Sequence, residues 1–303
     1  MSAWGDVTTI LTYNGWTLEP YGISYPREWT FERVGLPDQQ FAIDELRFNT
    51  RPAGAELTVP ADIYAAHHGR LRKVSAIPRG FGASTAPHEI APGILEYPGG
   101  WNVAFVKQDD GIVVIEASCS PHYAQQAFDA AEKRYNARVK AVITTSDSWP
   151  HIAGVRQAVA LGIPVYALDL NEPILNRIIA APHRREPDLL AQHPVPAHFR
   201  IVHNDIVVGV GSNRLQIVPY RTATGERQMM VYFPEYQLLY TSDLFSKDGK
   251  GGWFTPQYLH EMIGAVEREH LDVRNVFGMH YDVTPYTTLT AYLHAFVHPK
   301  TSS

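Results

Sequence analysis

The strongest constraint on the fold is the order in which strand-like and helix-like runs follow one another after residue 90. Short apolar runs rich in β-branched residues alternate here with longer runs of helical periodicity. The strand-like runs are residues 93–97, 101–106, 112–117, 141–144 and 164–168. The helix-like runs are residues 121–135, 151–161 and 173–180. An Asp-Gly turn at residues 109–111 joins two of the strands as a hairpin. This alternation predicts an α/β fold.

A second group of strands follows a proline-rich loop at residues 187–196. These runs are residues 198–202, 206–210, 214–219, 228–233, 237–240 and 273–277, and helix-like runs occur at 256–269 and 285–297. Two groups of strands, each accompanied by its own helices, predict two sheets that pack face to face with helices outside.

The first part of the chain has a different pattern. Residues 1–87 are rich in Pro, Gly, Trp and Tyr, with strand-like runs at 41–48 and 55–60 and helical periodicity at 63–74. We therefore predict an irregular, β-containing N-terminal extension at 1–87 and a main domain at 88–303. The many aromatic residues argue against disorder. An apolar arm that the core does not need predicts a homodimer.

Composition excludes several classes of protein. The 26 Lys and Arg against 31 Asp and Glu give a net charge of -5, which argues against a nucleic-acid partner. No apolar run approaches the length of a membrane span, and the first residues lack a signal-peptide pattern. A single cysteine, Cys119, excludes an internal disulfide and a four-cysteine zinc site. We expect a cytoplasmic protein without a membrane partner. The 14 histidines leave metal or acid–base chemistry open.

Four motifs share their order and spacing with one known family. They are the hairpin at residues 101–117, the strand-loop-helix at 141–154, the strand pair that ends at 239–245, and residues 276–281 before the last helix. Together they resemble the metallo-β-lactamase family. The resemblance covers about residues 88–299 and implies an αββα sandwich. It also implies the family's chemistry, in which two metal ions share a hydroxide that attacks a carbonyl or phosphoryl centre.

The metal-binding motif of the family is degraded in this sequence. The family's Thr-His-x-His-x-Asp-His motif corresponds to residues 145–151, where Ser146 and Ser148 replace the two leading histidines. Pro150 replaces the aspartate, and only His151 remains. Serine is a poor zinc ligand and proline is none, so the resemblance does not extend to a binuclear zinc β-lactamase.

Three later positions complete the comparison. Arg221 falls near the position of the family's third histidine, whereas Asp243 and His280 match the bridging aspartate and the last histidine. His151, Asp243 and His280 are therefore the ligand set that the resemblance implies for one zinc or iron ion. Asp147 and His122 are alternative sources of a fourth ligand.

Two interpretations of this site remain open. In the first, one metal ion activates water in a hydrolase of an ester, lactone, amide or phosphoester, and Arg221 binds the substrate or an oxyanion. In the second, there is no metal, and Arg221 pairs with Asp243 to replace its charge. Ser146 and Ser148 then complete a polar pocket for a small molecule, in a non-catalytic protein that binds a ligand or a protein partner. A metal-free variant of catalysis would use Ser146 or Ser148 as nucleophile and His151 as base.

Other residues near these motifs have less distinctive patterns. Glu116 is expected to orient a loop as a hydrogen-bond acceptor. Cys119 is either a buried apolar residue or a nucleophile with His122 as its base. The glycine-rich run at residues 246–253 is either a lid beside the pocket or an exposed turn, and its Lys247 and Lys250 are candidates to attract an anionic substrate.

Overall fold

The computed structural model divides the chain into two units. It describes residues 4–50, 59–76, 86–99, 101–250 and 252–299. One unit is Asp6–Ile77, and the other is Met1–Gly5 together with Pro78–Ser303. The predicted boundary after residue 87 stays a prediction, because residues 77–85 lie outside the described part.

The smaller unit contains an antiparallel sheet and a helix. Strands β1 (Thr9–Glu19), β2 (Ile23–Arg33) and β3 (Leu36–Ala42) pair in that order, and α1 (Ala61–Ala76) follows. Large apolar side chains such as Tyr13, Trp16 and Phe41 are exposed on these strands. Of the strand predicted at 41–48, only the first two residues belong to β3, and residues 55–58 lie outside the described part. The homodimer expected from this extension stays a prediction.

The larger unit begins with a seven-stranded sheet in the order β10-β9-β8-β7-β6-β5-β4. Its strands are β4 (His88–Ala91), β5 (Ile94–Tyr97), β6 (Val103–Gln108), β7 (Gly111–Ile115), β8 (Val139–Ile143), β9 (Val165–Leu168) and β10 (Phe199–Val202). Strands β7 to β10 are parallel, whereas β4 to β7 pair antiparallel.

A second, six-stranded sheet follows in the order of the chain. Its strands are β11 (Ile206–Val208), β12 (Leu215–Pro219), β13 (Met229–Phe233), β14 (Leu238–Tyr240), β15 (Asn275–Gly278) and β16 (Tyr281–Pro285). Only β14 and β15 pair in parallel. The sequence did not predict β16, which has polar residues in most positions.

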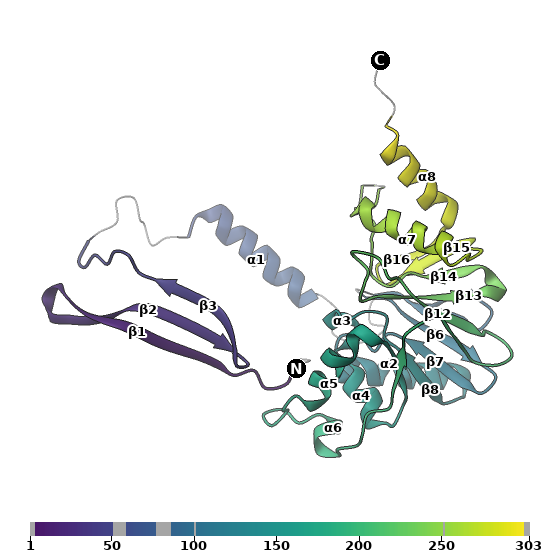
Figure 1. Cartoon of the computed structure of the whole chain (residues 1–303), viewed down its shortest axis with the longest axis horizontal. Coiled ribbons are helices and arrows are strands. Elements are labelled where there is room, and N and C mark those ends of the chain that lie inside the picture. Colours follow the sequence, from purple (N-terminus) through teal and green to yellow (C-terminus); the bar gives the residue numbers. More distant parts are fainter. Residues whose placement is uncertain (1–3, 51–58, 77–85, 100, 251, 300–303) are drawn as a thin grey trace. The chain divides into compact units, whose positions relative to one another are not determined.

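Alternating side chains along the strands build three layers of core. On β7, Ile112 and Val114 pack in a cluster with the helices of the first sheet, whereas Val113 and Ile115 pack against residues of the second sheet. On the second sheet, Val218 and Met230 pack with the last two helices. This arrangement confirms the αββα sandwich (Figure 1).

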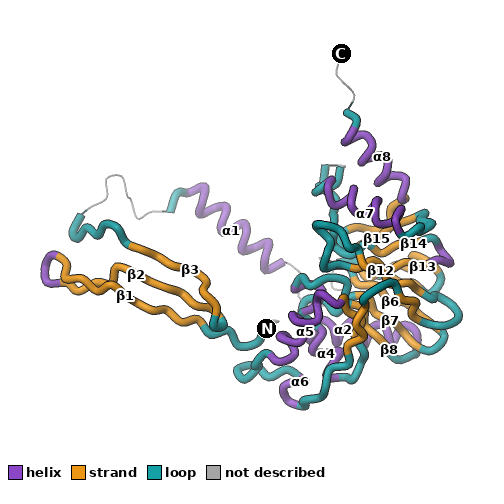
Figure 2. Tube along the Cα trace, viewed as in Figure 1, coloured by secondary structure: helices purple, strands orange, loops and turns teal. Residues whose placement is uncertain are grey.

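The helices lie outside the two sheets (Figure 2). Those of the first half are α2 (Pro121–Tyr135), α3 (Trp149–Ile152), α4 (Val155–Ala160), α5 (Glu172–Ala180) and α6 (Leu189–Gln192), and those of the second are α7 (Pro256–Arg268) and α8 (Tyr286–Val297). The helix predicted at 151–161 is divided at Gly154 into α3 and α4. Among the described helices, none combines the length and apolar composition that crossing a bilayer requires.

Candidate functional site

The candidate site lies where strands of both sheets end. Ile115 of β7 is in register with Ile143 of β8, so the residues after each strand lie at one edge of the first sheet. Tyr240 of β14 is in register with Phe277 of β15 at an edge of the second sheet. Loops after the carboxyl ends of parallel strands are the usual place for a binding site in α/β proteins. Here they bring together residues 116, 145–151 and 241–243.

Backbone conformation at this edge is unusual. Glu116 directly follows β7 and has a φ of +80°. Ser242 is the second residue after β14 and has a φ of +63°. Residues with a side chain seldom adopt positive φ, and such strain persists only where the surrounding structure imposes it. In both cases the turn directs a side chain into the same buried network.

His151 is the centre of that network. The imidazole is fully buried, and its Nδ1 lies 2.8 Å from Oε2 of Glu116, which is also fully buried. Its Nε2 lies 3.0 Å from Oδ2 of Asp243, an ion-pair contact rather than a well-aligned hydrogen bond. One imidazole therefore lies between two carboxylates that come from different sheets.

Buried hydroxyl groups hold the Glu116 carboxylate in place. Tyr240 donates its hydroxyl to Oε1 of Glu116 at 3.1 Å, and the Thr145 hydroxyl donates to the same oxygen. The Thr145 oxygen also forms a 2.7 Å hydrogen bond with the Ser242 hydroxyl. The Thr145 backbone N–H points to Oε2 of Glu116 at 3.4 Å. These contacts agree with the predicted role of Glu116 as a loop-orienting acceptor, but its closest ionisable partner, His151, was not predicted.

The two carboxylates keep the imidazole protonated. Burial lowers the pKa of His151, but the close contacts with the carboxylates of Glu116 and Asp243 together raise it to about 10. Burial raises the pKa of Asp243, and the opposing effects of His151 and His280 leave it below its ordinary value. At neutral pH the site is therefore an imidazolium between two carboxylates.

Arg221 does not take the predicted position. Its guanidinium donates to both carboxylate oxygens of Asp169, at 3.0 and 3.1 Å, and to the carbonyl of His203 at 2.8 Å. The predicted pairing with Asp243 is therefore wrong. The backbone of Arg221 has a positive φ of 51°, and its guanidinium contacts the Asp169 carboxylate, which offers two acceptor oxygens. Asp243 instead faces the cationic His151.

The two predicted serines shape the loop before α3. Ser146 is buried, and its hydroxyl oxygen accepts the backbone N–H of Ser148 at 3.2 Å. Ser148 is the N-terminal flanking residue of α3 and makes no side-chain cap there. The His151 backbone N–H donates to the carbonyl of Ser148 at 2.9 Å, but within the described part of the chain no hydrogen bond joins either serine side chain to the imidazole.

The other candidates lie apart from the network. Asp147 faces Arg227 at 3.7 Å, and His122 is exposed on α2, so neither is placed as a fourth ligand. Burial raises the pKa of the Cys119 thiol to about 12. At neutral pH this cysteine is therefore a thiol and not a nucleophilic thiolate.

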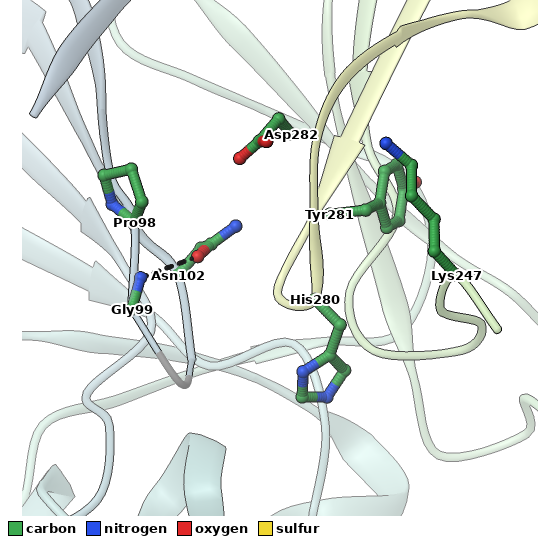
Figure 3. A pocket seen from close by; sticks show the side chains of 7 residues that line it. All are labelled: Pro98, Gly99, Asn102, Lys247, His280, Tyr281 and Asp282. Atoms are coloured by element: carbon green, nitrogen blue, oxygen red, sulfur yellow. Dashed lines mark hydrogen bonds between the residues drawn. The ribbon is translucent and has the colours of Figure 1, made fainter. Parts of the chain in front are cut away.

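His280 lies in the turn between β15 and β16 and lines a small pocket (Figure 3). The electrostatic interaction of His280 with Asp243 lowers the pKa of the Asp243 carboxyl group. The side chain itself is directed to the pocket that Asn102, Lys247 and Asp282 also line.

These donors do not fit the predicted single-metal site. Among the described residues, no group of three or more His, Cys, Asp or Glu side chains could hold a metal ion. His151 and Asp243 are together, but zinc sites in proteins use at least three protein ligands. A metal would also have to displace the proton of His151. Because the two carboxylates raise the pKa of His151, this competition weakens metal binding at neutral pH.

Comparison with known proteins gives similarity of structure only. No protein-family model and no curated protein matches the sequence. Among solved structures, a metallo-beta-lactamase from Pontibacter korlensis has a TM-score of 0.53 at 13% identity, over 69% of this chain and 97% of that one. A metallo-beta-lactamase from Erythrobacter litoralis has the same TM-score and identity, over 72% and 97%.

The stereoselective inverting sec-alkylsulfatase Pisa1 from Pseudomonas sp. is a further neighbour. Its TM-score is 0.51 at 15% identity, and the match covers 70% of this chain but only 41% of that one. The neighbours are thus named as lactamases and an alkylsulfatase, and at these identities the likeness concerns the fold alone.

Proposed function

We propose that this chain, which has the metallo-β-lactamase fold, is a metal-free, non-hydrolytic member of that fold that binds a small polar molecule. One observation carries the proposal. Both ring nitrogens of the buried His151 face carboxylates, at 2.8 and 3.0 Å. The imidazolium is a fixed cation in the position that the resemblance assigns to a metal ligand.

The imidazolium stabilises the loops around it as a metal ion would. It joins the residue after β7, the first residues of α3 and the loop after β14 through two charged contacts. A buried charge is tolerated when it is paired and hydrogen-bonded, and removing one partner leaves the other uncompensated. The network therefore gives a physical reason for retaining His151 and Asp243 when the other ligands of the motif are lost.

The same network argues against metal-free hydrolysis. A general base must be able to accept a proton near the working pH, and His151 already holds one. The Cys119 thiol stays protonated, and the Ser146 hydroxyl is buried in its own loop. Among the described residues, no serine or cysteine is paired with a base in the way that nucleophilic catalysis needs.

A hydrolase with one metal ion is the second candidate, and one observation favours it. Oδ1 of Asp243 is buried without a hydrogen-bond partner among the described residues. An unsatisfied carboxylate oxygen of this kind fits a metal ion, and it fits a donor group of a ligand equally well. The metal would require a neutral His151 and a third ligand beside His151 and Asp243.

Metal content separates the two candidates. The protein is purified without a histidine tag, incubated with Zn²⁺, Fe²⁺ or Mn²⁺, dialysed, and measured by elemental mass spectrometry. We expect no stoichiometric metal in the parent, in His151→Ala, or in the control His122→Ala, which changes an exposed histidine of α2. One metal per chain in the parent and the control, lost in His151→Ala, would contradict the proposal and direct attention to ester, lactone and phosphoester substrates.

A further inference from the structure

A small pocket opens beside the His151 network. It has a volume of about 230 Å³ and is lined by Pro98, Gly99, Asn102, Lys247, His280, Tyr281 and Asp282. These residues come from the loop before β6, the segment after β14, and the hairpin between β15 and β16 (Figure 3). Pockets for drug-sized ligands usually span roughly 300–1,000 Å³, so this one suits a smaller metabolite.

Asn102 fixes one wall of the pocket. Its amide Nδ2 donates to Oε1 of Glu96 at 3.0 Å and to the carbonyl of Gly278 at 3.1 Å, and its Oδ1 accepts the Gly99 N–H at 3.0 Å. Its backbone N–H also donates to the carbonyl of Met279 at 2.9 Å. Both hydrogens of the Asn102 side-chain amide are therefore engaged in hydrogen bonds within the protein. Asn102 also connects the two sheets at the hairpin between β15 and β16.

Tyr281 fixes the opposite wall. Its ring stacks on Phe245 with a centroid distance of 5.2 Å and meets the edge of Trp253 at the same distance. Its hydroxyl forms a hydrogen bond with Thr241. Two walls held in this way make a pocket that exists before a ligand arrives, which lowers the entropic cost of binding.

Two opposite charges line this pocket without neutralising each other. Among the described residues, neither the Lys247 ammonium nor the Asp282 carboxylate has an ion-pair partner. Lys247 lies over the Trp253 ring at 5.9 Å, a contact that leaves the hydrogens of its ammonium available. Figure 3 shows the Asp282 carboxylate between the hairpin and Asn102, with the Lys247 ammonium beside the Tyr281 ring.

We propose that this pocket binds a small zwitterion of the α-amino acid class, whose ammonium group contacts Asp282 and whose carboxylate contacts Lys247. Lys247 and Asp282 are both exposed, so each is free to contact a ligand, and a zwitterion can contact both where a ligand with one charge contacts one. Charge-assisted hydrogen bonds are stronger than neutral ones, so these two contacts would fix the orientation of such a ligand. The inference rests on the proposed function, because it names the ligand class of a protein without hydrolytic metal chemistry.

Isothermal titration calorimetry of the full chain tests this inference. The probes are the standard amino acids, one at a time, and for each that binds, its N-acetyl derivative and its α-amide. We expect at least one amino acid to bind with one site per chain. Asp282→Asn and Lys247→Met should each weaken it at least about tenfold, as expected for losing a charged hydrogen bond. Lys250→Met, an exposed lysine of the same loop outside the pocket, should leave the affinity unchanged.

The modified probes assign each contact. The N-acetyl derivative lacks the ammonium, so Asp282→Asn should not weaken its residual binding further. The α-amide lacks the carboxylate, so Lys247→Met should not weaken its binding further. Thermal melting of each variant checks that it is folded.

Three results would overturn the inference: no amino acid binds, binding is insensitive to both pocket variants, or the N-acetyl derivative binds as tightly as the parent amino acid. Failure here is distinguishable from failure of the proposed function. A chain that takes up no metal and binds no amino acid refutes only the ligand class, whereas one that takes up metal through His151 refutes the proposed function itself.

Discussion

At the scale of single residues, the site depends on a buried cation. His151 has no exposed surface, and a lone charge in such a place would be strongly unfavourable. Glu116 and Asp243 offset the cost of burying this charge, and the imidazolium in turn offsets the repulsion between the two carboxylates. The three side chains are therefore energetically coupled, and a change in any one affects the others.

Replacing Glu116 tests this coupling. We expect Glu116→Gln to lower the free energy of unfolding by about 3–5 kcal/mol at pH 7, because it breaks a buried ion pair. The control is Glu226→Gln on an exposed side chain, which should change stability by no more than about 0.5 kcal/mol. Urea denaturation measures both. Equal stabilities of Glu116→Gln and the parent would contradict the account.

The pH dependence has a defined sign. The pKa of His151 is raised in the folded state, so its stabilising effect is complete below its unfolded value of about 6.5 and is lost as the pH rises toward about 10. In Glu116→Gln this loss should be smaller and should end at a lower pH, because one of the carboxylates that raise the folded-state pKa is gone. The same urea series at several pH values shows the difference.

At the scale of elements, the strands and helices of the sandwich were largely predictable because their periodicities are strong. The parallel strands β7, β8 and β9 are short apolar runs, and α2, α7 and α8 follow their predicted ranges within one residue. From that order the sequence also placed His151 and Asp243 near each other. What it did not predict are features set by contacts between elements that are distant in the chain.

Gly154 and Arg221 show why. A Cβ on Gly154 would lie 2.7 Å from the carbonyl of Ala117 and 2.6 Å from the Cβ of Ala124, so the helix breaks where the chain passes α2. Periodicity alone gave one continuous helix there. Arg221 was assigned by its position in the motif, but its backbone conformation and the nearby Asp169 determine its partner. The roles of Thr145, Tyr240 and Ser242 likewise require the register of strands from both sheets.

At the scale of the whole molecule, the sandwich has its own cores. Each of its three apolar clusters is built from residues of the larger unit. From the N-terminal segment, Trp4 packs at the edge of one cluster, and the Arg177 guanidinium lies over its ring at 5.7 Å.

Deletion of the N-terminal residues tests this independence. We expect residues 78–303 alone to unfold cooperatively, with a melting temperature reduced by only a few degrees, about as much as Trp4→Ala reduces it in the full chain. Circular dichroism and calorimetry measure both proteins. If residues 78–303 failed to fold while Trp4→Ala stayed folded, the larger unit would depend on residues 6–77.

The protonation state of His151 tests the central claim most directly. Nitrogen-15 NMR of the histidine rings distinguishes an imidazolium from a neutral or metal-bound imidazole, with the exposed His122 as the internal comparison. We predict that His151 carries protons on both ring nitrogens at neutral pH and shows no titration near 6.5, because its pKa is about 10. A His151 that titrates near 6.5, or a neutral ring whose Nε2 shift moves on addition of Zn²⁺, would contradict the account.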